Sequence, residues 1–162
     1  MKLTDRLKVE HGIFLKQLAF LEGLVKVGAP ATVLAVVAET IALAEEDHSQ
    51  IESRVLYPVL EKEVGSDYGP LRQVAQDHAA LASLIARIRG TEVDAALVLE
   101  LVTLMRDHLE REIHGLFALA DERIPAERLE ALCNWDEEHL YESLGRRREW
   151  VERWLKDGGV AN

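Results

Sequence analysis

The sequence contains very little cysteine, glycine or proline. Its one cysteine, Cys133, excludes an intrachain disulfide and a cysteine-based zinc site. Ten glycines and four prolines in 162 residues are too few for a collagen-like chain and argue against an all-β fold with many tight turns. The opening residues, MKLTDRLKVEHG, lack the apolar core of a signal peptide, and no apolar run is long enough to span a membrane. We therefore expect a cytoplasmic protein with no membrane partner.

Basic residues are also scarce relative to acidic ones. The chain has 19 lysines and arginines against 29 aspartates and glutamates, which gives a formal net charge of -10. Such a chain repels phosphate backbones, so we expect no nucleic-acid partner. Hydrophobic residues make up 48% of the chain, which is ordinary for one folded domain with a sizeable core.

The apolar residues that are present recur with a helical period. No segment shows sustained apolar–polar alternation, and the first helix has apolar residues at spacings of three, four or seven, namely Leu3, Leu7, Phe14, Leu18, Leu21 and Val25. Loops are indicated at 28–30 and 64–70, and Gly90 is expected to follow the end of the third helix as its C′ residue. The predicted helices cover about 4–27, 31–62 and 71–89. A fourth helix is expected to start from an N-cap at Thr91 or Asp94 and to run to about 121. Pro58 should kink the second helix or end it early.

These helices and short loops predict an all-α fold. Short connections between long helices favour antiparallel neighbours, so we expect an up-down-up-down four-helix bundle over residues 1–122. Pro125 opens an additional C-terminal helical segment, and we expect residues 123–162 to form an extension packed on the bundle. Trp135, Trp150 and Trp154 would pack that segment onto the bundle or form a surface for a protein partner or a second copy of the chain.

The sequence also contains an internal repeat. The segment DHSQIE at 47–52 resembles DHLERE at 107–112, and the similarity continues into Leu56-Tyr57 and Leu116-Phe117. Glu10-His11 similarly resembles Asp77-His78. The first two helices therefore look like the last two.

The repeat carries a set of metal-ligand side chains. His48 and Glu52 are four residues apart, so both leave the same face of a helix, and His108 and Glu112 repeat this arrangement. His11 lies nearly as far before the 28–30 turn as His48 lies after it, which places the two at one level of an antiparallel hairpin. His78 and His108 are related in the same way. Four imidazoles and two carboxylates can thus converge in one layer.

Metal chemistry explains this combination of side chains. Nitrogen and oxygen ligands suit iron, manganese or zinc, and six of them exceed the needs of a tetrahedral zinc site. Two ions that prefer octahedral coordination could each take two imidazoles, both bridging glutamates and a bridging oxo or hydroxo group. These are five ligands, which leaves one open position on each ion. The predicted metal ligands are His11, His48, Glu52, His78, His108 and Glu112. Acids that precede the histidines could orient imidazoles, but not those of their own neighbours, because adjacent helical positions diverge by about 100°; these acids are Glu10, Asp47, Asp77 and Asp107.

The order H…HxxxE…H…HxxxE over about residues 5–121 resembles the hemerythrin-like, HHE cation-binding family. The resemblance implies a cofactor of two oxo- or hydroxo-bridged iron ions inside a four-helix bundle, with the glutamates bridging. It also implies oxygen, peroxide or nitric oxide as the small-molecule ligand, because members carry or sense oxygen, handle nitric oxide or peroxide, or report iron status.

The chain departs from the oxygen-carrying hemerythrins at two places. Those proteins have a second histidine on the third helix, four residues from the first, where this chain has Val74 and Ala82. They also have an aspartate-containing motif on the fourth helix, where this chain has Glu112. One imidazole fewer favours redox chemistry, such as decomposition of peroxide, or sensing, over reversible oxygen carriage.

Other functions remain open at this point. The chain could be a non-catalytic iron- or oxygen-responsive binding module, or an iron-storage type of metal-binding protein, so whether it is an enzyme is undecided. Manganese or zinc can replace iron in such a ligand set. A ferritin-like centre fits less well because it needs Glu-x-x-His on two helices, and only Glu45 and His48 provide that spacing.

Overall fold

A computed structural model describes residues 1–90 and 92–134, and these residues contain helices and no strands. The predicted all-α class is confirmed over this part of the chain. The predictions for Trp135, Trp150 and Trp154 fall outside the described residues. In chain order the elements are α1 (Leu3–Lys26), α2 (Ala31–Ile51), η1 (Glu52–Leu56), α3 (Tyr57–Val64), α4 (Gly69–Gly90), α5 (Ala95–Arg111), η2 (Glu112–Leu116), α6 (Phe117–Arg123) and α7 (Ala126–Asn134).

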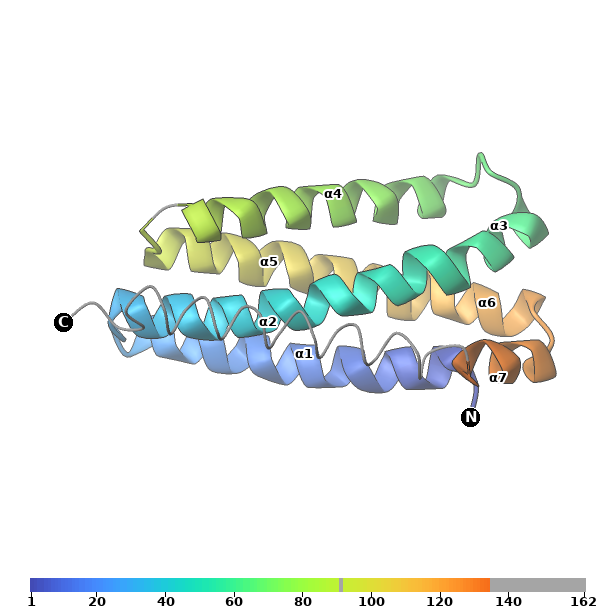
Figure 1. Cartoon of the computed structure of the whole chain (residues 1–162), viewed down its shortest axis with the longest axis horizontal. Coiled ribbons are helices and arrows are strands. Elements are labelled where there is room, and N and C mark those ends of the chain that lie inside the picture. Colours follow the sequence, from blue (N-terminus) through green and yellow to red (C-terminus); the bar gives the residue numbers. More distant parts are fainter. Residues whose placement is uncertain (91, 135–162) are drawn as a thin grey trace.

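The long helices lie side by side, and the direction of the chain reverses at each turn. Figure 1 shows α1 and α4 running one way along the molecule, while α2 with α3 and α5 with α6 run the other way. α1 packs against α2 and α5, and α4 packs against the same two helices. α7 packs beside α1 near its N-terminal end. None of the helices in the described part is both long and apolar enough to cross a membrane.

The second and fourth predicted helices each contain a π-helical turn. In η1 the Tyr57 N–H bonds to the Glu52 carbonyl, and in η2 the Phe117 N–H bonds to the Glu112 carbonyl. These bonds span five residues, where an α-helix spans four. The predicted early end of the helix at Pro58 was wrong. Pro58 lies in the first turn of α3, where its missing N–H is tolerated, and the helix continues to Val64.

Two of the predicted helix boundaries can be compared with local geometry. The Asp94 side chain accepts a hydrogen bond of 2.8 Å from the Leu97 N–H, so the predicted N-cap at Asp94 is confirmed. Gly90 is instead the last residue of α4, and it is not among the glycines with positive φ. The helix therefore ends at the predicted residue, but the prediction that Gly90 is a C′ residue beyond the helix end was wrong. Gly28 does have a positive φ, 69°, and this lets the chain reverse after α1.

The core is divided into two apolar clusters. One cluster contains Phe14 and Leu18 of α1 together with Leu81 of α4 and Met105 of α5. The other contains Leu3, Leu7 and Val74 from the opposite halves of α1 and α4, together with Leu116 of η2 and Leu129 of α7. Between them α1 contributes His11, which follows Leu7 by one turn and precedes Phe14. The apolar clusters thus enclose a polar layer from both ends.

Candidate metal centre

The six predicted metal ligands come together in that polar layer. They are His11 from α1, His48 from α2, Glu52 from η1, His78 from α4, His108 from α5 and Glu112 from η2. Five of the six are at most 2% exposed, and only His78 is appreciably exposed, at 14%. Burying this many polar groups is costly unless each finds a partner.

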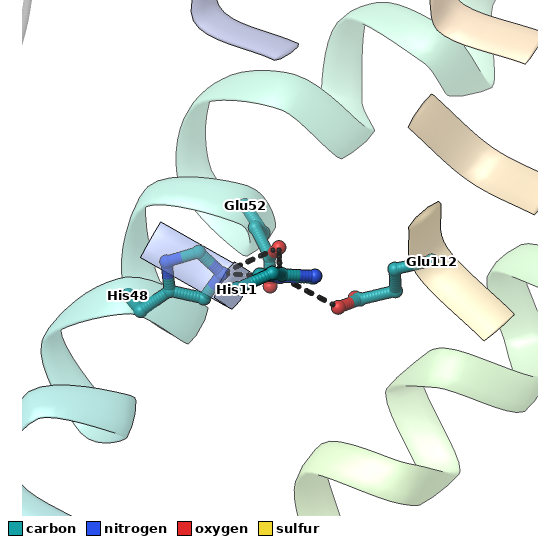
Figure 2. Close-up of side chains that lie close together, drawn as sticks. All are labelled: His11, His48, Glu52 and Glu112. Atoms are coloured by element: carbon teal, nitrogen blue, oxygen red, sulfur yellow. Dashed lines mark hydrogen bonds and ion pairs between the residues drawn. The ribbon is translucent and has the colours of Figure 1, made fainter. Parts of the chain in front are cut away.

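The first half of the layer is formed by His11 and His48 with the two glutamates (Figure 2). The Nε2 atoms of His11 and His48 are 2.8 Å apart, and Nε2 of His48 lies 2.9 Å from Oε1 of Glu52. Nε2 of His11 lies 3.4 Å from both Oε1 of Glu52 and Oε2 of Glu112. One potential ligand atom from each of the four side chains therefore faces a common point.

The second half uses His78 and His108 with the same glutamates. Nε2 of His108 lies 3.1 Å from Oε2 of Glu112, and Nε2 of His78 lies 3.4 Å from Oε2 of Glu52. Nε2 of His78 is 3.7 Å from Oε1 of Glu112. As in the first half, one ligand atom from each residue lies within 4.8 Å of all the others. Glu52 and Glu112 belong to both halves.

Several polar atoms of this layer have no hydrogen-bond partner. They include both carboxylate oxygens of Glu52, Oε2 of Glu112 and Nε2 of His78. An unsatisfied buried polar atom costs about 1–3 kcal/mol, and more when it is charged. Coordination to metal ions would satisfy these atoms, and the nitrogen and oxygen donors suit iron, manganese or zinc. The residues present therefore fit a metal centre.

The protonation preferences of the layer reflect burial and crowded charge. Burial acts to lower the pKa of His48, but Glu52 and Glu10 raise it to about 10. Burial lowers the pKa of His108 to about 4. Burial raises the pKa of Glu112 well above its ordinary value, and the nearby charge of Glu52 adds to this effect. Burial also acts to raise the pKa of Glu52, but His48 holds it well below its ordinary value.

The π-helical turns add two aromatic residues that sequence reasoning did not assign to the site. The ring of Phe117 packs on His11 with centroids 4.9 Å apart, and the ring of Tyr57 stacks on His78 at 6.1 Å. The Tyr57 hydroxyl also donates a hydrogen bond to Oε1 of Glu112. The signal was present in the internal repeat, where Leu56-Tyr57 aligns with Leu116-Phe117.

Two of the acids next to the histidines contact imidazoles of a neighbouring helix. The Nδ1 atom of His48 lies 2.7 Å from Oε2 of Glu10, which belongs to α1. Asp77 of α4 lies farther from His108, with 3.7 Å between Oδ2 and Nδ1. The expectation that these acids do not serve their own neighbours agrees with this cross-helix arrangement. Asp107, by contrast, is exposed.

Comparison with known proteins gives one match. A family model described as the hemerythrin HHE cation binding domain matches residues 2–120. No curated protein and no solved structure matches the chain.

Proposed function

The chain belongs to the hemerythrin HHE cation-binding family, and from this premise we propose that it is a non-haem di-iron protein that reacts with or senses oxygen, peroxide or nitric oxide. The observation that carries the proposal is the convergence of four imidazoles and two carboxylates in one buried layer. The proposal includes an up-down-up-down four-helix bundle over residues 1–122, with residues 123–162 as an extension. The alternating helix directions and the packing of α1 and α4 against both α2 and α5 support this architecture.

In this proposal the six side chains divide into two pairs and two bridges. His11 and His48 hold one ion, His78 and His108 hold the other, and Glu52 and Glu112 contact both. Two iron ions held there would supply one- and two-electron redox chemistry toward a small oxygen or nitrogen species. The protein holds the ligands rigidly and, through the apolar clusters on both sides of the layer, excludes bulk water.

The pattern of burial supports a small ligand. His78 is the ligand residue that solvent touches most, and its Nδ1 lies 3.4 Å from the hydroxyl of the exposed Ser53. The other five ligand residues are almost completely covered. A diatomic molecule or peroxide is small enough to approach the layer at His78, and we expect the cover over the other ligands to exclude a large organic substrate.

The decisive experiment is metal analysis combined with an absorption spectrum of the protein purified from its own source. We expect two iron ions per chain and charge-transfer absorption in the near ultraviolet and visible range. Zinc in a single tetrahedral site, or no bound metal, would overturn the proposal.

A second measurement separates a redox protein from a non-catalytic iron- or oxygen-responsive module or a storage protein. The iron-loaded protein should decompose hydrogen peroxide well above the rate of the same amount of free iron. His114→Ala is the matched control, because His114 is an exposed histidine two residues from Glu112. A rate no higher than that of free iron would favour the binding module.

A further inference from the structure

We propose that the two halves of the centre bind metal unequally. The half containing His11 and His48 forms a tight first position, and the half containing His78 and His108 forms a weaker second position that is controlled by Tyr57. This inference rests on the proposed function, because it concerns the same ligands, but it makes a separate statement about the order and strength of binding.

The internal repeat makes the comparison of the halves direct. Phe117 packs on His11 in the first half, and Tyr57 occupies the equivalent place against His78 in the second. The two aromatic residues differ by one hydroxyl group. That hydroxyl is therefore a chemical difference between two otherwise corresponding positions.

The Tyr57 hydroxyl reaches the oxygen of Glu112 that faces only the second position. It donates its hydrogen bond to Oε1 of Glu112, and this oxygen is the one near Nε2 of His78, at 3.7 Å. The other oxygen of Glu112, Oε2, faces His11 at 3.4 Å and His108 at 3.1 Å. A metal at the second position must compete with the Tyr57 proton for Oε1, because a donated hydrogen bond reduces the electron density that the oxygen offers.

The two oxygens of Glu52 face the two halves separately. Its Oε1 faces His48 at 2.9 Å, its Oε2 faces His78 at 3.4 Å, and neither oxygen has a hydrogen-bond partner. Glu52 is thus arranged to contact both metal positions. Glu112 faces both halves with Oε2, and it offers its other oxygen to a metal at the second position only when the Tyr57 hydrogen bond is broken.

The outer nitrogens of the imidazoles differ in the same direction. The Nδ1–H of His48 donates to Glu10 at 2.7 Å, which fixes the ring with Nε2 directed into the layer. Nδ1 of His108 has no hydrogen-bond partner. Its nearest acid, Asp77, is 3.7 Å away and instead accepts hydrogen bonds from Arg111 at 2.9 Å and Gln73 at 3.1 Å. Nδ1 of His11 also lacks a partner, so this difference concerns His48 and His108.

The binding order is tested by titrating the metal-free protein with Co²⁺ under anaerobic conditions, followed by calorimetry and visible absorption. We expect two steps whose dissociation constants differ at least about tenfold. His78→Ala should retain the tight step and lose the weak one, whereas His48→Ala should lose the tight step. Two equal steps, or loss of the tight step in His78→Ala, would overturn the inference but leave the proposed function standing. Binding of no Co²⁺ by the folded wild-type protein would overturn both.

The controlling residues are tested in the same titration. Tyr57→Phe should strengthen the weak step by about tenfold and change the tight step less than threefold. Tyr68→Phe is the matched control, because Tyr68 is half-buried beyond α3 and away from the ligands. A weaker second step in Tyr57→Phe would mean that the phenol oxygen is itself a ligand, and it would overturn the assigned role.

Glu10→Gln supplies the test of the first position. Loss of a carboxylate that orients a metal-binding histidine typically costs 10–100-fold in affinity, so the tight step should weaken within that range while the weak step is unchanged. Glu110→Gln, at an exposed position of α5, should change neither step. An effect of Glu10→Gln confined to the weak step would contradict the assignment of the halves.

Discussion

His48 and His108 occupy equivalent places in the internal repeat but differ in their preference for a proton. The pKa of His48 is raised to about 10 because Glu52 and Glu10 outweigh the effect of burial, whereas burial lowers the pKa of His108 to about 4. In the metal-free layer His48 is therefore the ring that favours the proton, and His108 is the ring that favours the neutral form. Metal binding must displace the proton from His48, since only a neutral imidazole coordinates.

The ligand assignment predicts the effect of removing either imidazole. His48→Ala and His108→Ala should each reduce the metal content of the purified protein. Each should also lower the melting temperature of the metal-loaded protein by roughly 5–10 °C, because a ligand that binds only the folded state stabilises it by about 3 kcal/mol at a hundredfold excess over its dissociation constant. His114→Ala should do neither. Two metals per chain in His48→Ala would contradict the assignment.

Val74 provides a second prediction about a single residue. It lies one turn before His78 and is 2% exposed, whereas Ala82, one turn after His78, is exposed. Val74→His would place a polar ring in the core and should destabilise the metal-free protein by about 1–3 kcal/mol. Added metal should recover part of this loss, tighten metal binding and slow the turnover of peroxide.

Ala82→His is the control for this substitution. Its ring faces solvent, so the free energy of unfolding should change by less than about 0.5 kcal/mol and metal binding should not change. If Val74→His were destabilised equally with and without metal, the added imidazole would not be a ligand. The structure thus distinguishes two positions that spacing alone left equivalent.

Spacing predicted the side chains that come together in the candidate site, and the reason that it missed Tyr57 is physical. An α-helical register rotates five residues by about 500°, which would point residue 57 roughly 140° away from Glu52. In η1 the hydrogen bond from Tyr57 to the Glu52 carbonyl spans five residues and brings both side chains to the same layer. The register of this turn depends on packing around the layer, so periodicity in one segment could not predict it.

At the scale of the element, helices and their ends followed from the sequence where a local interaction sets them. Asp94 caps α5 through its own side chain, so its role could be read from residue type and position. The helix does not end at Pro58 because a proline is disruptive in the interior of a helix but tolerated in a first turn. The π-helical turn that precedes Pro58 makes it a first-turn residue of α3.

The cap at Asp94 predicts a loss of stability that is separate from metal binding. Asp94→Ala removes the acceptor for the Leu97 N–H and should lower the free energy of unfolding by about 1 kcal/mol, measured by urea denaturation of the metal-free protein. Asp94→Asn keeps an acceptor oxygen and should lose much less. Equal losses in the two variants would show that the charge of Asp94, and not its hydrogen bond, stabilises the start of α5.

The longest-range hydrogen bonds in the described part of the molecule are made by Asp121, which ties α6 to the start of α1. This carboxylate of α6 accepts hydrogen bonds from Lys2 at 2.8 Å, Thr4 at 2.7 Å and Lys8 at 2.6 Å. These contacts join α6 to the start of α1, and both helices contribute residues to the apolar cluster that contains Leu3 and Leu7. The far ends of a sequence can be paired in this way only after the helices have packed, so no local pattern indicated it.

The ties at Asp121 predict a specific dependence of stability on pH. Burial acts to raise the pKa of Asp121, but hydrogen bonds from Lys2 and Lys8 lower it from 3.8 to about 2. A carboxylate whose pKa is lower in the folded state contributes stability that is present above pH 3.8 and is lost as the pH falls through 2. Asp121→Asn should therefore lower the free energy of unfolding by about 1–2 kcal/mol at pH 7. The difference in free energy of unfolding between wild type and variant should shrink steadily below pH 4, as followed by urea denaturation at each pH.

Asp67→Asn is the control, because Asp67 is 99% exposed, and its effect should be small at every pH. A gap for Asp121→Asn that stayed constant from pH 7 to pH 3 would mean that the variant acts through packing and not through the charge that ties α6 to the start of α1.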